Sequence, residues 1–576
     1  MRQEARKVIS GMTSQSSTLS VISNESEKPA SLLWAPLIVI ATAAFALEIP
    51  FFFFGTPSGH DVEFHLYSWL EVLTQWKQGT LFPRWAAMAH FGYGEPRFIF
   101  YPPTSWLLGG LIGRLLPWSL ASPIFIWIAL VLAGISMLLL VRRWLDRRDA
   151  IFAAVLYAIN PYHIVIVYWR SAFAELLASS LIPLLFLCVL KIADGERRAT
   201  IFLSLILAAS WLTNAPAAVM IHYSAALLLI FFAGQRRSPK ILILGAAGVL
   251  LGAALSAFYL LPGIYEQKWI NIAEAVSAGS RPQDNFLFIH TTDPDHDAFN
   301  RIISWIAVLE MAVVFAGAWA AVKWRRTRPV LWKALLAWAT ACSIIMFSIT
   351  GVLWRYLPKL QFMQFPWRWL LCLSMIFSLL LTLGLRRWRM RTAVCLVAIC
   401  VIVISWRHIQ VPWWDNRGDL KEMQDNMIDQ IGYEGTDEYT PVGAEPSAVD
   451  KQAWKVHVNG TAHAAFHVYQ WNAESKFFTA QMSAPDQVVL KLFAYPAWRA
   501  EVNGRVVQTT ERQGTGQVLV PVEAGMNRVQ VTFTRTWDRT LGGWISLLTV
   551  IGILIGPSES RRKITSWRRI TRASTR

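Results

Sequence analysis

The fold class of this chain is decided by the stretch SPIFIWIALVLAGISMLLLVRR, residues 122–143. Residues 122–141 carry no ionisable side chain, and two arginines follow directly. A run of roughly 20 apolar residues crosses the bilayer core as a helix, because lipid offers no partners for backbone N–H and C=O groups. The sequence therefore predicts an integral membrane protein.

Similar apolar runs recur along the 576 residues, of which 54% are hydrophobic and only 16% are charged. Soluble domains carry about a quarter charged residues. The runs predict a polytopic α-helical membrane bundle with about twelve transmembrane helices, each of roughly the length that a bilayer requires. They lie near residues 33–54, 122–141, 150–168, 173–191, 200–217, 218–234, 241–262, 302–322, 332–352, 369–385, 393–408 and 541–557.

The net charge of +17 could indicate nucleic acid or anionic lipid as a partner, and the positions of the cations decide between them. Short connections between alternate spans are basic, as in Arg142-Arg143 and Arg236-Arg237, and so is the C-terminal tail. Loops of this kind stay in the cytoplasm and contact the inner leaflet. We expect both termini to be cytoplasmic, the lipid bilayer to be a partner and nucleic acid not to be one.

This orientation divides the chain into four parts. Residues 1–31 are polar and Ser-rich and are expected to form a disordered cytoplasmic tail. Residues 32–408 form the helical bundle, whose first external loop is 55–121, and residues 104–117 within that loop are expected to lie as an interfacial helix. Residues 409–540 form an extracytoplasmic domain, and 541–576 form the last span and a basic tail.

The extracytoplasmic domain has the alternation of strands with one buried face, as in Val488, Leu490 and Leu492. Asn503-Gly504 lies between two such segments and predicts a hairpin turn. Several short strands of this kind indicate a β-sandwich-like domain. It could bind an acceptor, contact a partner or only shield a site.

The first external loop contains the strongest candidates for chemistry. His60, Asp61 and His65 lie within six positions, and Asp61 and His65 share a face if a helix begins here. A carboxylate next to imidazoles can act as a general base for a hydroxyl or as a ligand of a divalent metal. Alternatively, Asp61 is only the N-cap of a helix over residues 62–77 and the histidines are solvated.

A second acidic segment lies in the loop 263–301. Asp293, Asp295 and Asp297 are interleaved with His290 and His296, and these side chains could hold Mg²⁺ or Mn²⁺. The alternative is a solvated turn begun by Asp293-Pro294. The five cysteines all lie in predicted spans, so the external segments offer no disulfide framework and no cysteine-based zinc site.

The chain contains the motifs Gly59-His60-Asp61…His65, Gly79…Pro83-Arg84-Trp85, Gly92-Tyr93-Gly94, Tyr101-Pro102-Pro103, Gln364-Phe365-Pro366-Trp367-Arg368, Gly435-Thr436-Asp437-Glu438-Tyr439-Thr440-Pro441 and Tyr495-Pro496-Ala497-Trp498. Together these motifs resemble a bacterial membrane-protein family called 6-pyruvoyl-tetrahydropterin synthase-related. The similarity covers most of the chain. A pterin synthase itself would need a soluble fold and a histidine cluster for zinc, and the sequence has neither.

The layout is also similar to the GT-C glycosyltransferases, polytopic enzymes that take sugars from polyprenyl-phosphate donors. By this resemblance Asp61 corresponds to their acidic residue in the first external loop, supported by His60 and His65. Arg368, Arg170 and Arg84 are candidates for binding the donor phosphate, and Tyr101 opens the second interfacial helix. The loop has no second acidic motif of the Asp-x-Asp type, so a metal requirement is left open.

The resemblance implies a glycosyltransferase at the outer face of the bacterial inner membrane, acting on an envelope glycan, lipid or protein. Three other functions are open. A transporter or lipid flippase would place ionisable residues within the spans. The predicted spans are nearly free of such residues, and Glu175 and Glu310 are the exceptions. A non-catalytic envelope-assembly protein would lack a cavity at Asp61. A polymerase or ligase of envelope glycans would use similar chemistry. For each arginine the alternative is an interfacial anchor.

Overall fold

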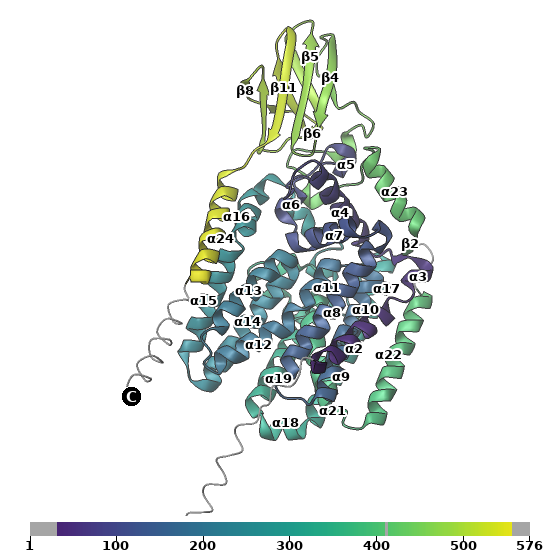
Figure 1. Cartoon of the computed structure of the whole chain (residues 1–576), viewed down its shortest axis with the longest axis vertical. Coiled ribbons are helices and arrows are strands. Elements are labelled where there is room, and N and C mark those ends of the chain that lie inside the picture. The colour runs from purple at the N-terminus through teal and green to yellow at the C-terminus, as the bar shows by residue number, and fades with distance from the viewer. Residues whose placement is uncertain (1–30, 409–412, 556–576) are drawn as a thin grey trace, which may run out of the picture.

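The computed structural model describes residues 31–408 and 413–555. It is a helical bundle with β-strands gathered at one end, beside the first external loop (Figure 1). The segment α18 (Val322–Thr327) lies at the opposite end (Figure 1). The loop 55–121 and the C-terminal strands, both expected outside the membrane, therefore lie together at the end of the bundle away from this basic connection. The two expected tails, 1–31 and the residues after 555, fall almost entirely outside the described residues.

Seven helical segments of the described chain are long and apolar enough to cross a membrane. Three helices within these segments begin at a capping residue. The side-chain oxygens of Asp146, Asn160 and Asn214 accept hydrogen bonds from backbone N–H groups in the turn that follows. The seven segments are Trp118–Val141 (α8, Ala121–Val141), Arg147–Arg170 (α9, Arg147–Ala158; α10, Pro161–Val165; η2, Ile166–Arg170), Phe173–Ala193 (α11, Phe173–Ser179; α12, Leu181–Ala193), Ala215–Arg236 (α14), Pro294–Ala320 (α17), Pro366–Gly384 (η8, Pro366–Trp369; α21, Leu370–Gly384) and Trp537–Ile555 (α24).

Two further pairs of helices qualify as spans only if each bent pair is taken as one, which gives up to nine. They are α15 (Pro239–Leu255) with α16 (Ala257–Tyr265) and η3 (Glu266–Trp269), bent by 75°, and α19 (Pro329–Ile344) with η6 (Ser348–Thr350) and α20 (Gly351–Tyr356), bent by 92°. The segments near 33–54, 200–217 and 393–408 are helical as α2 (Ser31–Leu47) with α3 (Phe51–Phe54), α13 (Ala199–Thr213) and α22 (Trp388–His408). The multi-pass bundle is thus confirmed, with seven to nine candidate spans among the described residues, while the other expected spans stay predictions.

The first external loop folds into helices that pack on the bundle. The helical spacing over 62–77 correctly predicts α4 (Val62–Lys77), and the apolar segment 104–117 corresponds to α7 (Pro103–Leu115). The two helices pack closely at Gly109 of α7. A Cβ added at this position would lie 2.0 Å from the indole of Trp69 in α4. In the sequence, α5 (Ala89–Gly92) and α6 (Arg97–Phe100) lie between α4 and α7.

The C-terminal strands form two antiparallel sheets, of four strands (β3-β6-β10-β9) and five strands (β4-β5-β11-β7-β8), that contribute to one hydrophobic core. The predicted hairpin is present: Val502 pairs with Arg505, and Asn503 and Gly504 adopt φ of 52° and 79°. The strands are β3 (Val456–Val458), β4 (Ala464–Trp471), β5 (Ser475–Met482), β6 (Asp486–Phe493), β7 (Trp498–Val502), β8 (Arg505–Val507), β9 (Thr510–Glu511), β10 (Gln517–Val522) and β11 (Gly525–Phe533).

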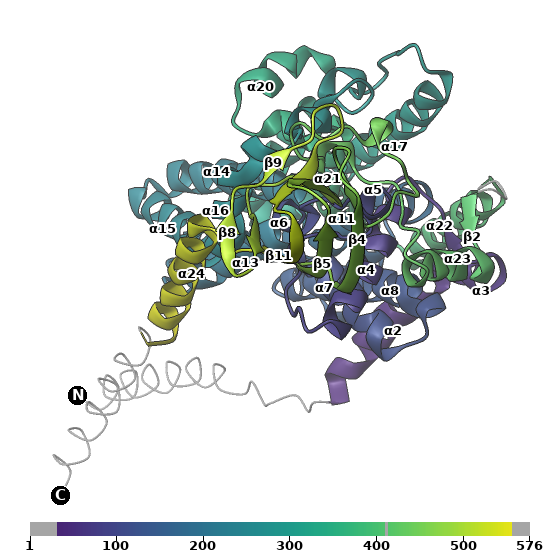
Figure 2. The same ribbon diagram turned by 90° about the horizontal axis from the view of Figure 1, so that it is seen from above.

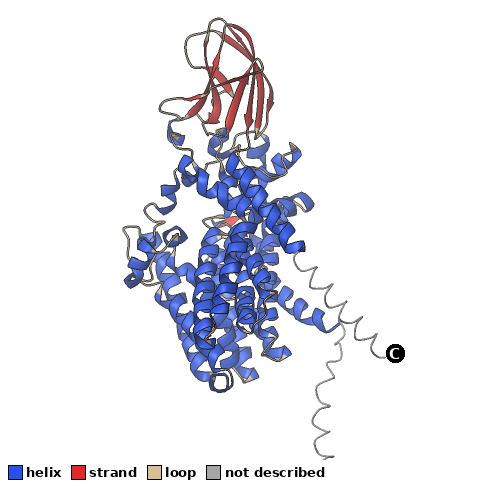
Figure 3. Ribbon diagram, turned by 90° about the vertical axis from the view of Figure 1, so that its left-hand side faces the viewer, coloured by secondary structure: helices blue, strands red, loops and turns tan. Residues whose placement is uncertain are grey.

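The strands lie over one end of the bundle, as the two rotated views show (Figure 2, Figure 3). Three connections hold them there. Near the first span, β1 (Thr56–Pro57) pairs with β2 (Trp414–Asp415), and α23 (Arg417–Ile428) follows. On the other side, the Glu266 carboxylate accepts hydrogen bonds from Arg539 at 2.7 Å and from the Tyr495 hydroxyl at 2.6 Å. The third connection is a buried polar network in the first loop, described below.

Candidate active site

Asp61 is positioned by backbone contacts between the first loop and the end of η2. The Asp61 N–H donates to the Arg170 carbonyl at 2.9 Å, and the Gly59 N–H donates to the Ser171 hydroxyl at 3.0 Å. A Cβ at Gly59 would lie 2.6 Å from the Arg170 carbonyl carbon, so only glycine allows this approach. Two segments far apart in sequence are thereby fixed against each other.

The Asp61 side chain does not cap the helix that it precedes. It accepts no capping hydrogen bond from α4, which removes the simplest structural explanation for this residue. Its carboxylate instead faces Arg170, with Oδ2 at 3.7 Å from Nη2. The Asp61 side chain is 41% exposed whereas that of Arg170 is 2% exposed. A solvent-accessible carboxylate therefore lies at the edge of a buried cation.

Behind this pair lies a buried carboxylate that binds two arginines. Glu175 Oε2 accepts from Arg170 Nη1 at 2.6 Å and from Arg368 Nε at 3.1 Å, while Oε1 accepts from the Tyr162 hydroxyl at 2.5 Å. Charge-assisted bonds of this length are among the strongest in proteins. Since Arg170 also faces Asp61, the four charged groups form one continuous cluster at the ends of three candidate spans.

Arg368 is held in place by the turn that carries the Gln364-Phe365-Pro366-Trp367-Arg368 motif. Its Nη1 donates to the Met363 carbonyl at 2.6 Å and to the Gln364 side chain at 3.1 Å. Its guanidinium lies 4.6 Å from the centre of the Phe365 ring, and that of Arg170 lies 5.0 Å from the Trp367 ring. Both distances are within the range of cation–π attraction.

Each arginine keeps one terminal nitrogen available to a ligand. Within the described residues, Arg368 Nη2 donates no hydrogen bond, and the 3.7 Å separation of Arg170 Nη2 from Asp61 is too long for one. Guanidinium groups match phosphate oxygens in geometry and charge. The cluster thus offers two preorganised donors beside an accessible carboxylate.

The two histidines and Tyr101 lie near Asp61 and differ in their ring contacts. The His60 ring packs against Phe299 at 6.0 Å, and burial lowers its pKa. His65 is buried and stacks on Phe173 at 5.0 Å, and burial lowers its pKa to about 4, so the ring is neutral at pH 7. Tyr101 packs against the His65 ring at 5.9 Å. His65 can support Asp61 only from the protein interior.

Arg84 is not part of this group. Its backbone N–H donates to Glu474 Oε1 at 2.8 Å and its guanidinium lies 4.4 Å from the Phe82 ring, so it joins the loop to the β-strands. Nothing in the sequence pattern distinguished it from Arg170, because both lie beside tryptophans near predicted membrane surfaces.

The acidic segment of the 263–301 loop forms local contacts. Asp293 caps α17 by accepting from the N–H groups of Asp295 and His296, and Asp297 binds Thr291. Across residues 31–408 and 413–555, no group of three or more His, Cys, Asp or Glu side chains is placed to hold a metal ion. The arrangement agrees with the alternative interpretation, a turn begun by Asp293, and gives the metal hypothesis no support.

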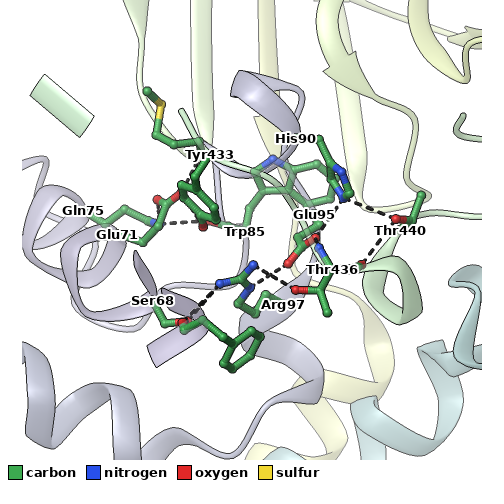
Figure 4. A network of polar contacts seen from close by, with 12 residues as sticks. Ser68, Glu71, Gln75, Trp85, His90, Glu95, Arg97, Tyr433, Thr436 and Thr440 are labelled. Carbon is green, nitrogen blue, oxygen red and sulfur yellow. Dashed lines mark hydrogen bonds and ion pairs between the residues drawn. The ribbon is translucent and has the colours of Figure 1, made fainter. Parts of the chain in front are cut away.

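A second buried network, which the sequence analysis missed, supports the loop that carries Asp61 (Figure 4). Glu95 accepts from Arg97 Nε at 2.6 Å and from the Thr436 N–H at 2.8 Å, and it pairs with His90 Nε2 at 2.9 Å. Arg97 also donates to the Ser68 hydroxyl at 3.0 Å. The network joins α4, α6 and the segment before the strands. In the sequence it was indicated only by the two family-like motifs around Gly94 and Thr436.

The pKa values of the two carboxyl groups in this network are shifted in opposite directions. Burial alone would raise the pKa of Glu95, but Arg97 and the hydrogen bonds from His90 and Thr436 lower it to about 2. Glu71, in the same network, has its pKa raised to about 7 by burial, against a 2.6 Å hydrogen bond from the Met88 N–H. Glu95 is therefore ionised and compensated, whereas Glu71 is about half protonated at pH 7.

A protein-family model matches the region of the chain that contains most of the charged cluster. The model of the 6-pyruvoyl-tetrahydropterin synthase related domain, described as a membrane protein, matches residues 98–411, a range that includes Arg170, Glu175 and Arg368 but not Asp61. No curated protein matches the chain. Because the match covers more than half of the sequence, this chain belongs to the 6-pyruvoyl-tetrahydropterin synthase related family of membrane proteins.

Proposed function

We propose that this protein is a GT-C-like glycosyltransferase that moves a sugar from a polyprenyl-phosphate donor to an envelope acceptor. The observation that carries the proposal is the exposed Asp61 carboxylate 3.7 Å from the buried Arg170, which shares Glu175 with Arg368. A base and a preorganised cationic site for a leaving phosphate are the two elements that this transfer requires.

The proposed reaction uses both parts of the cluster. Asp61 accepts the proton of the acceptor hydroxyl, whose oxygen forms a bond to the anomeric carbon of the sugar. The bond from that carbon to the phosphate oxygen breaks, and its electron pair leaves with the polyprenyl phosphate. Arg170 and Arg368 compensate the charge that the departing phosphate gains, and their rigid hydrogen bonding means that little reorganisation is needed.

We propose a topology that fits this chemistry. The bundle crosses the bacterial inner membrane twelve times, with both termini cytoplasmic, and the β-strands form a sandwich outside. A lipid-borne phosphate at the outer surface would then lie at the depth of Arg170 and Arg368, because both follow or begin apolar helical segments. The β-strands, joined to the loop through the Glu95 network, are placed to receive a water-soluble acceptor.

The test compares Asp61→Asn with the matched variant Glu63→Gln in membranes supplied with labelled polyprenyl-phosphate sugars. Glu63 is an exposed carboxylate in the first turn of α4 and has no arginine partner among the described residues. Loss of a general base lowers the rate by about 10²–10⁴-fold. We expect this loss for Asp61→Asn and near wild-type transfer for Glu63→Gln; equal transfer by both variants would exclude Asp61 as the base.

One observation favours a transporter as the second candidate. Glu310 lies in the middle of α17, is fully buried, and accepts hydrogen bonds from the Ser374 hydroxyl at 3.0 and 2.9 Å without a cationic partner among the described residues. Ionisable groups within spans commonly mark a transport path. Glu310→Gln should abolish lipid or glycan translocation in reconstituted vesicles if this function is correct, and should leave sugar transfer unchanged if it is not.

A further inference from the structure

A cavity of about 260 Å³ lies at the end of the bundle away from the β-strands. It forms where α8, α12, α14 and α19 end or begin, close to α18 at the lower end of Figure 1. Three basic side chains line it, Arg143, Arg236 and Arg328, together with one acidic side chain, Asp194. These four residues come from separate connections that only the packing of the helices brings together.

The charges around this cavity do not cancel. Asp194 binds both Arg143 and Arg236, with each terminal nitrogen 3.3 Å from a different carboxylate oxygen. Arg328 has no carboxylate partner in the described part of the chain, and its guanidinium lies 6.0 Å from the Trp324 ring. The lining thus holds three guanidinium groups and one carboxylate, which only two of them share, and the cavity has room for an additional anion.

The rest of the lining is apolar. Leu190, Phe232 and Leu331 face the same cavity, and they lie in the last or first turns of helices that form the hydrophobic bundle. Trp144 also lines it and packs edge-on against Trp324 at 5.6 Å. A ligand that fits this lining has an anionic group next to an apolar one.

We propose that this cavity binds the phosphate of an anionic phospholipid, with the arginines on the headgroup and the apolar side chains on the first part of the acyl chains. The shared chemistry with a soluble phosphate is the oxyanion, which a guanidinium fork binds through paired N–H donors. A lipid is the better fit because the cavity lies at the ends of candidate membrane spans and seven of its eleven lining residues are apolar. The site is separate from Asp61 and does not depend on the glycosyltransferase proposal.

The test uses the full chain in an uncharged detergent, where no membrane surface potential acts on it. Native mass spectrometry measures the affinity of phosphatidylglycerol and of phosphatidylcholine with identical acyl chains. We expect phosphatidylglycerol to bind at least about tenfold more tightly, because the trimethylammonium group of phosphatidylcholine would bring a like charge close to the three arginines. Equal affinities for the two lipids would overturn the proposal without any variant.

Two double variants then separate the cavity from general charge. R236Q/R328Q removes two lining arginines and their charge-assisted hydrogen bonds to the phosphate, and we expect phosphatidylglycerol to bind at least about tenfold more weakly. R325Q/R326Q removes the same charge from exposed positions of α18 that do not line the cavity, and affinity should stay within about threefold. Equal losses in both variants would show that the attraction is not specific to the cavity.

A last arm distinguishes the source of the phosphate. Glycerol phosphate is added to the wild-type protein in competition with phosphatidylglycerol. We expect no displacement at concentrations where the lipid is bound, because the soluble compound lacks the apolar contacts with Leu190 and Phe232. Displacement by glycerol phosphate at concentrations similar to those of the lipid would overturn the lipid assignment in favour of a soluble phosphate.

Discussion

Replacing Glu175 by glutamine gives the sharpest test of the charged cluster. The Glu175 side chain is 1% exposed and holds Arg170 at 2.6 Å and Arg368 at 3.1 Å. Glutamine keeps the shape of the side chain and one acceptor oxygen but removes the negative charge. The two guanidinium groups, 2% and 7% exposed, would then lie beside each other with no buried anion between them.

The magnitude follows from the burial of these groups. Removing one partner of a buried ion pair costs about 3–5 kcal/mol, because the remaining charge cannot be solvated. Asp61 would not replace Glu175, because its side chain is 41% exposed and it forms no ion pair with Arg368 among the described residues. We therefore expect Glu175→Gln to lower the free energy of unfolding by about 3 kcal/mol or more. The matched variant Glu196→Gln loses only a pair with Lys191 at the surface, worth about 0–1 kcal/mol.

Reversible unfolding of the full chain in mixed micelles with increasing SDS measures both variants against the wild type. A loss of less than about 1 kcal/mol for Glu175→Gln, comparable to that of Glu196→Gln, would refute the reasoning. It would mean that water reaches both arginines and that the cluster is not a preorganised cationic site. The phosphate-binding role of Arg170 and Arg368 would then lose its physical basis.

Three other predictions concern the first loop. Because the pKa of Glu95 is lowered to about 2, its contribution to stability is complete above about pH 4.5 and is lost as the pH falls towards 2, by about 3 kcal/mol in unfolding titrations. Because the pKa of Glu71 is raised to about 7, its burial lowers stability as the pH rises from about 4.5 to 7, and Glu71→Gln should flatten this decline. Gly109→Ala should cost about 1–3 kcal/mol, since its Cβ would meet Trp69 at 2.0 Å, whereas Gly234→Ala, in a helix with nothing within 4 Å, should stabilise the protein slightly.

Each of these predictions has an outcome that contradicts it. Unchanged stability between pH 5 and pH 3 would mean that Glu95 is not held as a compensated anion. An equally steep decline in wild type and Glu71→Gln between pH 5 and pH 8 would assign that pH dependence to another group. A stability for Gly109→Ala equal to that of Gly234→Ala would show that α7 can move away from α4 without cost.

Local patterns in the sequence predicted much of the secondary structure. The apolar run 122–141 became α8, the periodic segment 62–77 became α4, and Asn503-Gly504 became a hairpin. These features depend on the hydrophobicity and backbone preferences of neighbouring residues, which the sequence displays directly. The number of spans was harder to predict, because two bent helix pairs have the composition of crossings without their straight geometry.

The sequence by itself determined that this is a multi-pass membrane protein with an acidic residue before α4 and an arginine in the Gln364–Arg368 motif. Only the tertiary structure decided that Asp61, Arg170 and Arg368 converge on one cluster, that Glu175 is its centre, and that Arg84 lies elsewhere. The physical reason is that hydrophobic runs and turns depend on adjacent residues. An ion pair between residues more than a hundred positions apart depends instead on how the helices pack.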